Sequence, residues 1–466
     1  MKWRHWECLR SKLGGRPALV AVLALALAQV AAPQAAPTTP QVRPPQLHVV
    51  SHRLANGLLL LMVEGHAAPV INLQMWYHVG SKDEKPGRTG FAHLFEHLMF
   101  KGSAHVPPEQ HSRIIEAVGG FDNAYTSDDV TVYWETFPSN YLERVIWLEA
   151  DRLGSLKVDA ANFQSEREVV KEERRVRVED RPYGRVFEDL YAAAFTLHPY
   201  KHTTIGSMDD LNKARLEDVR AFFRTFYRPD NATMVIVGDF DASEAVRWVE
   251  KYFGGISRPA QPLPRVTLKE PPQQSERRLT KSYSNAPLPA VIEAYQMPAL
   301  FAPDSYPLNL AARILSAGES SRLYRKLVYE DRLAVEAAGF GNFTEDPNLF
   351  WAFAIMNQGK SPADGEKVMD AVLEQIKTQP VGAAELEKAK NQQIAGFILG
   401  RQTAQSKADA IAQYAVLGRD PERINTELDR YLGVTAADIQ RVAREYFVPQ
   451  RRTVLVIEPP KAPEKK

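Results

Sequence analysis

Residues 90–100 read Gly-Phe-Ala-His-Leu-Phe-Glu-His-Leu-Met-Phe and contain a His-x-x-Glu-His motif. On a helix, positions i, i+3 and i+4 share one face, so His93, Glu96 and His97 are expected to point the same way. Leucine, phenylalanine and methionine side chains cover the remaining sides, which is typical of a buried helix with a single polar stripe.

Such a stripe predicts a metal site. Two imidazoles and a carboxylate in an apolar setting need a partner that compensates for their lost hydration, and a divalent metal supplies it. Neutral His93 and His97, one turn apart, suit zinc, and Glu96 is then free to act as general base on a zinc-bound water. This is the motif of the inverted zincins. The alternative, a satisfied pair of core histidines beside a surface glutamate, is less favoured because three ionisable groups share one polar face.

Length and composition indicate the domain number and the broad class of the protein. With 466 residues the chain is too long for one hydrophobic core and suits two or more domains. Hydrophobic residues at 44% and charged residues at 25% are typical of a soluble globular protein. The net charge of +1 gives no electrostatic reason to expect nucleic acid as a partner.

The N-terminus predicts a secretory signal peptide over residues 1–36, with cleavage between 31 and 36. Five basic residues precede an apolar run at 18–28, and small residues follow it. The run is short for a membrane span, so we expect a periplasmic or secreted protein without a stable span after cleavage; an uncleaved anchor is the alternative. The single cysteine, Cys8, leaves with this segment, so any metal must be held by histidine and carboxylate.

The third metal ligand is expected in the acidic helical segment 165–178. A capping box of Ser165 and Glu168 predicts its start, and Pro182 its end. If Val169, Val170 and Val176 point inward, Glu173 lies roughly 20° and Glu166 roughly 40° from that direction, whereas Glu172 and Glu168 lie roughly 80° and 120° away. Glu173 is therefore the predicted ligand and Glu166 an outer or catalytic carboxylate. Glu168, Glu172 and Glu179 are expected to face solvent.

These segments resemble the pitrilysin/insulinase family of zinc metallopeptidases, which includes the mitochondrial processing peptidases. The resemblance rests on residues 90–97, on Glu166-Arg-Glu-Val-Val-Lys-Glu-Glu173 and on Gly119-Gly-Phe-Asp-Asn-Ala-Tyr-Thr126. It extends more faintly over nearly the whole mature chain. The resemblance implies one zinc ion per chain held by His93, His97 and Glu173, with Glu96 as general base and Glu166 as a second active-site glutamate.

Residues 119–133 have their own interpretation. Gly119-Gly120 gives a flexible entry, and alternating residues through Tyr133 predict a strand. In the family this strand's edge holds substrate backbone by β-augmentation, which would make Asn123, Ala124 and Tyr125 substrate contacts. An ordinary strand pair is the alternative.

The chain also looks duplicated. At a shift of 220 residues, Asp218 to Val237 falls on Asp438 to Ile457, a helix, a proline turn and a strand in each copy, and Pro69 falls on Pro289. This pattern predicts an α+β protein with two homologous modules, each an antiparallel or mixed sheet flanked by helices. We expect a zinc-binding module at 45–257, a proline-rich linker at 258–284, a degenerate module at 285–458 and a disordered tail at 459–466.

The two copies differ in their chemistry. Residues 296–466 contain no histidine, so only the first module can hold the metal. In the second, Gly318 to Leu327 resembles a family segment whose arginine, here Arg322, binds substrate together with a tyrosine a few residues on. Val335 occupies the place of that tyrosine, and this departure puts in question whether the chain completes its own active site.

Together these patterns predict a secreted zinc endopeptidase that hydrolyses flexible peptides. A homologous metal-free subunit is the expected partner in a heterodimer, with a homodimer as the second option. A noncatalytic assembly or scaffold subunit on the same fold is the alternative function, and a metal-buffering or solute-binding protein is a third. Zinc-dependent cleavage would distinguish the first from the others.

Overall fold

The computed structural model describes residues 42–460. The predicted signal peptide at 1–36 lies outside the described residues, as does most of the predicted tail, residues 461–466. Residues 43–460 belong to one compact unit. Within 42–460, none of the helices combines the length and the apolar character that a membrane crossing needs.

The first module contains six strands: β1 (Val50–Arg53), β2 (Leu59–Glu64), β3 (Val70–Tyr77), β4 (Phe121–Thr126), β5 (Thr131–Pro138) and β6 (Ala232–Gly238). They form one mixed sheet in the order β1-β2-β6-β3-β5-β4. Only β2 and β6 are parallel. The predicted strand at 119–133 is a hairpin of β4 and β5, and β4 is the edge of the sheet.

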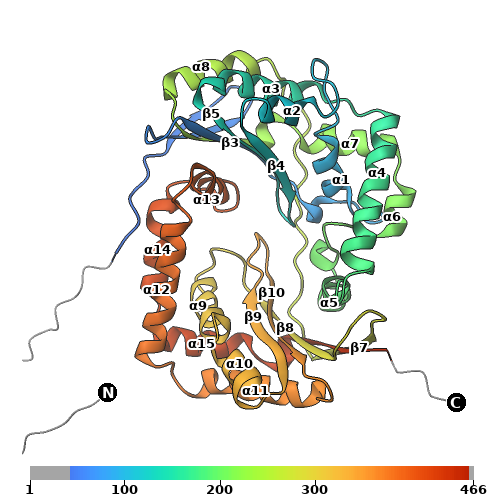
Figure 1. The fold of residues 1–466 in the computed structure, drawn as a ribbon, viewed down its shortest axis with the longest axis vertical. Helices are drawn as coiled ribbons and strands as arrows, with labels where there is room; N and C mark the ends of the chain where they lie inside the picture. The colour runs from blue at the N-terminus through green and yellow to red at the C-terminus, as the bar shows by residue number, and fades with distance from the viewer. Residues whose placement is uncertain (1–41, 461–466) are drawn as a thin grey trace, which may run out of the picture. The chain divides into compact units, whose positions relative to one another are not determined.

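Eight helices accompany this sheet in the first half of the described chain, and most of them pack on one of its faces (Figure 1). They are α1 (Phe91–Leu98), α2 (Gln110–Glu116), α3 (Leu142–Ser155), α4 (Ala160–Arg174), α5 (Val186–Ala194), α6 (Met208–Lys213), α7 (Leu216–Phe226) and α8 (Ala242–Phe253).

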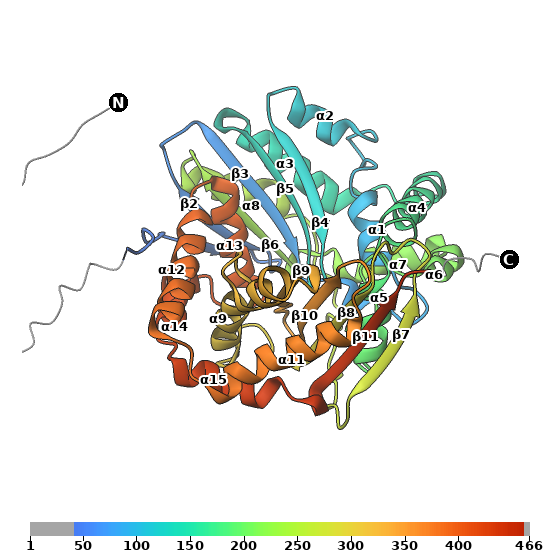
Figure 2. The ribbon, with the colours of Figure 1, turned by 60° about the horizontal axis from the view of Figure 1, so that its bottom comes forward.

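The second module repeats the plan with five strands, β7 (Arg277–Ser282), β8 (Ala290–Met297), β9 (Ala334–Gly341), β10 (Asn348–Met356) and β11 (Arg452–Glu458), in the order β7-β11-β8-β10-β9. Helices α11 and α15 lie across this sheet in Figure 2. The helices of this half are α9 (Ser305–Ser316), α10 (Arg322–Tyr324), α11 (Pro362–Thr378), α12 (Ala383–Leu399), α13 (Ala404–Val416), α14 (Arg423–Leu432) and α15 (Ala436–Tyr446).

The duplication is visible element by element. Helix α7 and strand β6 fall on α15 and β11 at a shift of 220 residues, and the starts of β3 and β8 differ by the same amount. The strand order β2-β6-β3-β5-β4 corresponds to β7-β11-β8-β10-β9, with a parallel pair at the same place in each sheet. The predicted α+β fold with two homologous modules is confirmed.

Part of the predicted linker belongs to the second sheet. Residues 277–282 form β7, which pairs in parallel with β11. The sequence Arg-Arg-Leu-Thr-Lys-Ser was hard to distinguish from a polar linker because β7 is an edge strand whose side chains are largely exposed. The stretch without helix or strand thus ends at residue 276.

Each sheet has a face covered by helices of the other module. On the first sheet, Trp76 and Val235 pack against Ile411 of α13. On the second, Ile292 and Trp351 pack against Leu190 of α5. Strands buried on both faces read as continuous apolar runs, and all residues of β6 are buried. Besides its own core, each module therefore takes part in apolar clusters that it shares with the other.

A buried charge network also joins the modules. The Lys82 side chain is 6% exposed, and its Nζ lies 2.8 Å from Asp129 in the first module and 2.7 Å and 3.0 Å from Glu345 and Asp346 in the second. The Tyr200 hydroxyl donates a hydrogen bond to Asp129 and accepts one from the Asp346 backbone. Three carboxylates compensate one buried ammonium, so the β9–β10 loop is held against the β4–β5 turn.

Another buried network lies beneath β5. Arg152 of α3 donates to both Glu135 and Glu149, and His111 contacts the same two carboxylates. Burial raises the pKa of Glu149 to about 8, although the Arg152 guanidinium opposes this shift. Burial lowers the pKa of His111 to about 4, so this imidazole is neutral at neutral pH.

The Glu149 shift predicts a pH-dependent stability. The pKa of Glu149 is about 8 in the folded protein and 4.5 in an unfolded chain. The protonated Glu149 side chain therefore contributes fully to the free energy of unfolding below pH 4.5, and this contribution is lost as the pH rises through about 8. We expect Glu149→Gln to lose less stability than the wild type between pH 6 and pH 9, measured as the urea midpoint. Glu168→Gln, at an exposed glutamate, is the matched control. Equal slopes for Glu149→Gln and the wild type would contradict the assignment.

Candidate active site and metal centre

Helix α1 is held by a buried carboxylate at its N-terminus. Glu84 accepts hydrogen bonds from the backbone N–H groups of Gly90 and Ala92, which have no partner within the helix. Gly90 has φ +91°, and a side chain there would collide with the Ile205 carbonyl. Phe95 and the neighbouring apolar residues of α1 enter the core. The one polar face carries His93, Glu96 and His97, as predicted from their spacing.

Helix α4 carries the predicted third ligand, although it begins earlier than expected. It starts at Ala160, where Asp159 accepts a hydrogen bond from the Asn162 backbone, and not at a Ser165–Glu168 capping box. Val169 and Val176 are 46% and 56% exposed, so their predicted inward orientation is wrong.

The buried side of α4 consists instead of Phe163, Glu166, Val170 and Arg174. Glu173 is next to this side and its side chain is 16% exposed. Glu168 and Glu172 are 54% and 65% exposed. The direction taken from the three valines is roughly 80° from the true buried side of α4. Glu173 and Glu166 lie between the two directions, so both carboxylates are still largely buried.

The donor atoms of His93, His97 and Glu173 converge within 4.8 Å of one another. Glu173 Oε2 lies 3.6 Å from His93 Nε2 and 3.3 Å from His97 Nε2. Two donors on a tetrahedral zinc ion, at ligand distances of about 2.0–2.1 Å, are about 3.3 Å apart. Two imidazole nitrogens and one carboxylate oxygen with this spacing therefore fit a zinc ion that keeps a fourth position open.

The protonation of the two histidines differs. Burial and the neighbouring His97 lower the pKa of His93 to about 4, so this ring is neutral and ready to act as a ligand. Burial also disfavours a charged His97, but hydrogen bonds with Glu166 and Glu173 outweigh it and raise its pKa to about 9. Binding a divalent metal at these donors would therefore release one proton from His97, the one on Nε2.

Glu96 lies on the same face but outside the donor set. The Thr126 hydroxyl, at the end of strand β4, donates to Glu96 Oε2 at 2.7 Å. Burial raises the pKa of Glu96, and the Thr126 hydrogen bond opposes that shift. A carboxylate with a raised pKa, held beside a metal position, is suited to accept a proton.

A cavity of about 1070 Å³ opens over these residues. Its walls come from both modules, because Glu336, Phe353 and Ile355 of the second sheet line it together with α5 and the turn after α4. The predicted substrate contacts Asn123, Ala124 and Tyr125 all line this cavity. They lie on β4, whose outer edge pairs with no other strand of residues 42–460.

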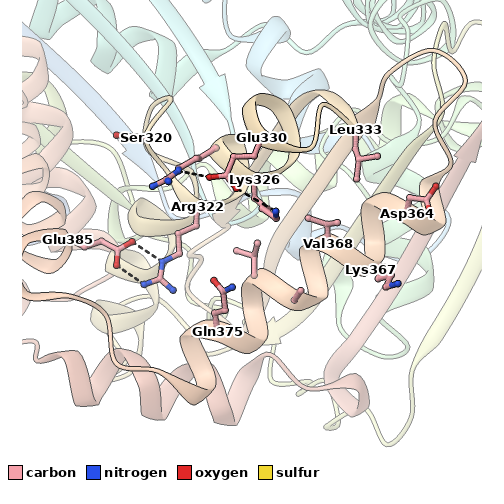
Figure 3. Close-up of a pocket in the computed structure, with 13 residues that line it drawn as sticks. Ser320, Arg322, Lys326, Glu330, Leu333, Asp364, Lys367, Val368, Gln375 and Glu385 are labelled. Atoms are coloured by element: carbon pink, nitrogen blue, oxygen red, sulfur yellow. Dashed lines mark hydrogen bonds and ion pairs between the residues drawn. The ribbon is translucent and has the colours of Figure 1, made fainter.

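Arg322 does not line the metal cavity. It lies in a second cavity of about 690 Å³ beside α10 and α11, where its guanidinium donates to Glu385 at 2.8 Å and 2.6 Å (Figure 3). Val335 is exposed on the edge strand β9, and the next residue, Glu336, is the one that reaches the metal cavity. The structure thus brings together every predicted site residue except Arg322.

Three residues near the metal position were not identified from the sequence. Thr126 binds Glu96, Arg177 lies 2.7 Å from Glu173 Oε1, and Lys101 lies 3.0 Å from Glu166 Oε1. Helical spacing carried a signal for Arg177, four residues after Glu173. The contacts of Thr126 and Lys101 join segments distant in the sequence.

Comparison with known proteins is consistent with this geometry. The family model described as "Insulinase (Peptidase family M16)" matches residues 60–208, and the model described as "Peptidase M16 inactive domain" matches residues 213–393. The first match contains all the predicted metal donors, and the second covers much of the module without histidines.

Similar proteins match over most of the chain. The zinc protease PqqE of Helicobacter pylori is 32% identical over 408 residues, which cover 87% of this chain and 92% of that protein. The mitochondrial-processing peptidase subunit beta of Lentinula edodes is 26% identical over 414 residues, covering 84% and 86%. The crystal structure of a protease from Helicobacter pylori superposes with a TM-score of 0.86 at 31% identity and covers 89% of this chain and 100% of that one.

The position of Glu173 predicts the effect of replacing it. Glu173→Gln should weaken zinc binding by more than the roughly 10–100-fold that loss of an outer-shell partner costs, because it removes a charged ligand. Glu172→Gln is the matched control, since the adjacent side chain is exposed, and it should leave zinc affinity unchanged. Metal analysis after dialysis measures both. Zinc loss in the Glu172 variant would show that the donor set is wrong.

Proposed function

The chain belongs to the insulinase (M16) peptidase family, and we propose that it is a zinc-dependent endopeptidase. The observation that carries this proposal is the convergence of two histidine nitrogens and one glutamate oxygen within 4.8 Å, with Glu96 beside them in the same cavity. The similarity to proteins named zinc protease supports the choice of metal. We expect one zinc ion per chain.

His93, His97 and Glu173 would hold the metal, which supplies the Lewis acidity that activates a water molecule and polarises a peptide carbonyl. Glu96 is placed to take the proton of the attacking water and to pass it to the leaving amine. The Thr126 hydroxyl fixes one Glu96 oxygen, so the carboxylate is oriented before substrate arrives. The raised pKa of Glu96 makes it a stronger base than an exposed glutamate.

The substrate side of the proposal rests on β4. Within the part of the chain that the structure describes, β4 is an edge strand that runs along the cavity from Asn123 to Thr126, so an extended peptide could add to the sheet there through backbone hydrogen bonds. Such pairing needs a locally unfolded substrate with exposed N–H and C=O groups. Flexible peptides are therefore the proposed substrates.

We also propose that the protein acts in the periplasm or outside the cell, because residues 1–36 have the basic, apolar and small-residue order of a signal peptide.

We further propose that the protein works with a partner chain. The second module supplies no metal ligand, Val335 stands where a substrate-binding tyrosine is expected, and Arg322 is engaged with Glu385. A homologous metal-free subunit, or a second copy of this chain, would supply the missing groups.

Replacing the general base tests the mechanism. Glu96→Gln should retain zinc, because none of the three donors is changed, and should lower kcat for peptide hydrolysis by at least about 10²–10⁴-fold. Normal cleavage by this variant would remove Glu96 from the mechanism. A wild-type protein that binds zinc and cleaves none of a diverse peptide library would favour the noncatalytic subunit.

The partner prediction is tested by size and activity together. The mature chain alone should cleave peptides weakly, and the native complex purified from its source should be larger and more active because substrate-binding groups come from the second chain. Light scattering and peptide assays before and after separation of the subunits measure this. A fully active monomer would contradict the partner proposal, whereas an active homodimer would show that Val335 is compatible with full activity.

A further inference from the structure

Glu166 contacts the predicted ligand His97 at the ring nitrogen that does not face Glu173. Its Oε2 is 3.4 Å from His97 Nδ1, whereas His97 Nε2 faces Glu173. A carboxylate beside Nδ1 keeps the proton on that nitrogen, which leaves the lone pair of Nε2 directed at the metal position. The orientation of the His97 ring therefore depends on where the Glu166 carboxylate is held.

The Glu166 carboxylate is itself buried and needs further partners. Its side chain is only 4% exposed, and a buried carboxylate is costly unless it is paired. Its second oxygen, Oε1, lies 3.0 Å from Lys101 Nζ, and the Ser165 hydroxyl donates to it at 3.2 Å. Within residues 42–460, the only basic side chains that pair with Glu166 are His97 and Lys101.

We propose that Lys101 is a positioning residue of the metal centre, which acts through Glu166 on the zinc ligand His97. The inference rests on the proposed function, since it takes His97 as a ligand. His97 and Lys101 are four residues apart, at the end of α1 and in the turn that follows, and they hold the two oxygens of one carboxylate between them.

The contacts of Glu166 with Lys101 and His97 also set the distance between α1 and α4. Glu166 lies two turns before Glu173 on α4, whereas both histidines lie on α1. Tying Glu166 to the end of α1 therefore brings Glu173 to the imidazole nitrogens. Without the ammonium of Lys101, the buried Glu166 carboxylate would turn toward water. The His97 ring would then lose its orientation, and α1 and α4 would no longer be held in their relative position.

Zinc affinity, measured by competition with a chromophoric chelator, tests the proposal without an activity assay. Lys101→Met should raise the zinc Kd by about 10–100-fold, the cost of losing an outer-shell partner. Lys101→Arg keeps the positive charge and should stay within about threefold of the wild type. The visible absorption of the cobalt(II)-substituted protein should change in Lys101→Met and not in Lys101→Arg, because it reports on ligand geometry.

The chain offers a matched control at the same lysine. Lys101 Nζ also contacts Glu109, whose side chain is 51% exposed. Glu109→Gln removes that partner and leaves Glu166 untouched, so it should not change the zinc Kd. A loss equal to that of Lys101→Met would show that any perturbation of Lys101 weakens the site, and would overturn a role through Glu166.

A double-mutant cycle tests whether Lys101 acts through Glu166. Glu166→Gln has no charge to neutralise, so adding Lys101→Met to it should cause little further loss of zinc affinity. Additive losses would overturn the proposal, as would an unchanged Kd in Lys101→Met alone. If Lys101→Met does not fold, the double variant decides, because its failure to fold as well would assign Lys101 a purely structural role. A wild-type protein that binds no zinc would instead overturn the metal centre itself.

Discussion

The desolvation of ionisable groups on α1 is the constraint on which the rest of the structure depends. The helix is apolar on its other sides and packs into the core, so His93 and His97 lose most of their contact with water. Compensation must come from another element at short range, and α4 supplies it with two carboxylates two turns apart. The mutual position of α1 and α4 is therefore an electrostatic requirement as well as a packing result, and contacts that hold these helices together are part of the site.

The second module supplies none of the predicted metal ligands, but it forms part of the cavity around them. It has no histidine, yet its sheet forms one wall of the metal cavity, and its α13 covers a face of the first sheet. Helix α5 of the first module covers the second sheet in return. Separation of the modules would expose both faces, so this exchange keeps the cavity walls together. The Lys82 network adds a specific connection between the modules, since it holds the β9–β10 loop against the turn that follows β4.

Local rules explain what the sequence could predict. The i, i+3, i+4 spacing predicted that His93, Glu96 and His97 share one face of α1, and the 220-residue repeat predicted two modules whose elements coincide at that shift. Glu173 converges with the histidines although Val169 and Val176 are exposed, because it lies between the direction taken from the valines and the true buried side of α4. The helix start at Ala160, strand β7 and the Arg322–Glu385 pair were missed. Strand β7 and the Arg322–Glu385 pair depend on contacts between distant segments, which periodicity does not report. The helix start has a local signal, the Asp159 N-cap, which competes with the Ser165–Glu168 pattern.

The repeat also shows why the predicted metal donors occur in one copy. Both sheets end in an edge strand next to a helix, β4 beside α1 and β9 beside α9. In the first copy α1 carries ionisable groups, which require the carboxylates of α4. In the second copy the buried side chains of α9 are mostly apolar, so its packing needs no such partner. A buried histidine on α9 would need a carboxylate partner on a neighbouring element. The histidines and their carboxylate partners are therefore expected to be present together or absent together.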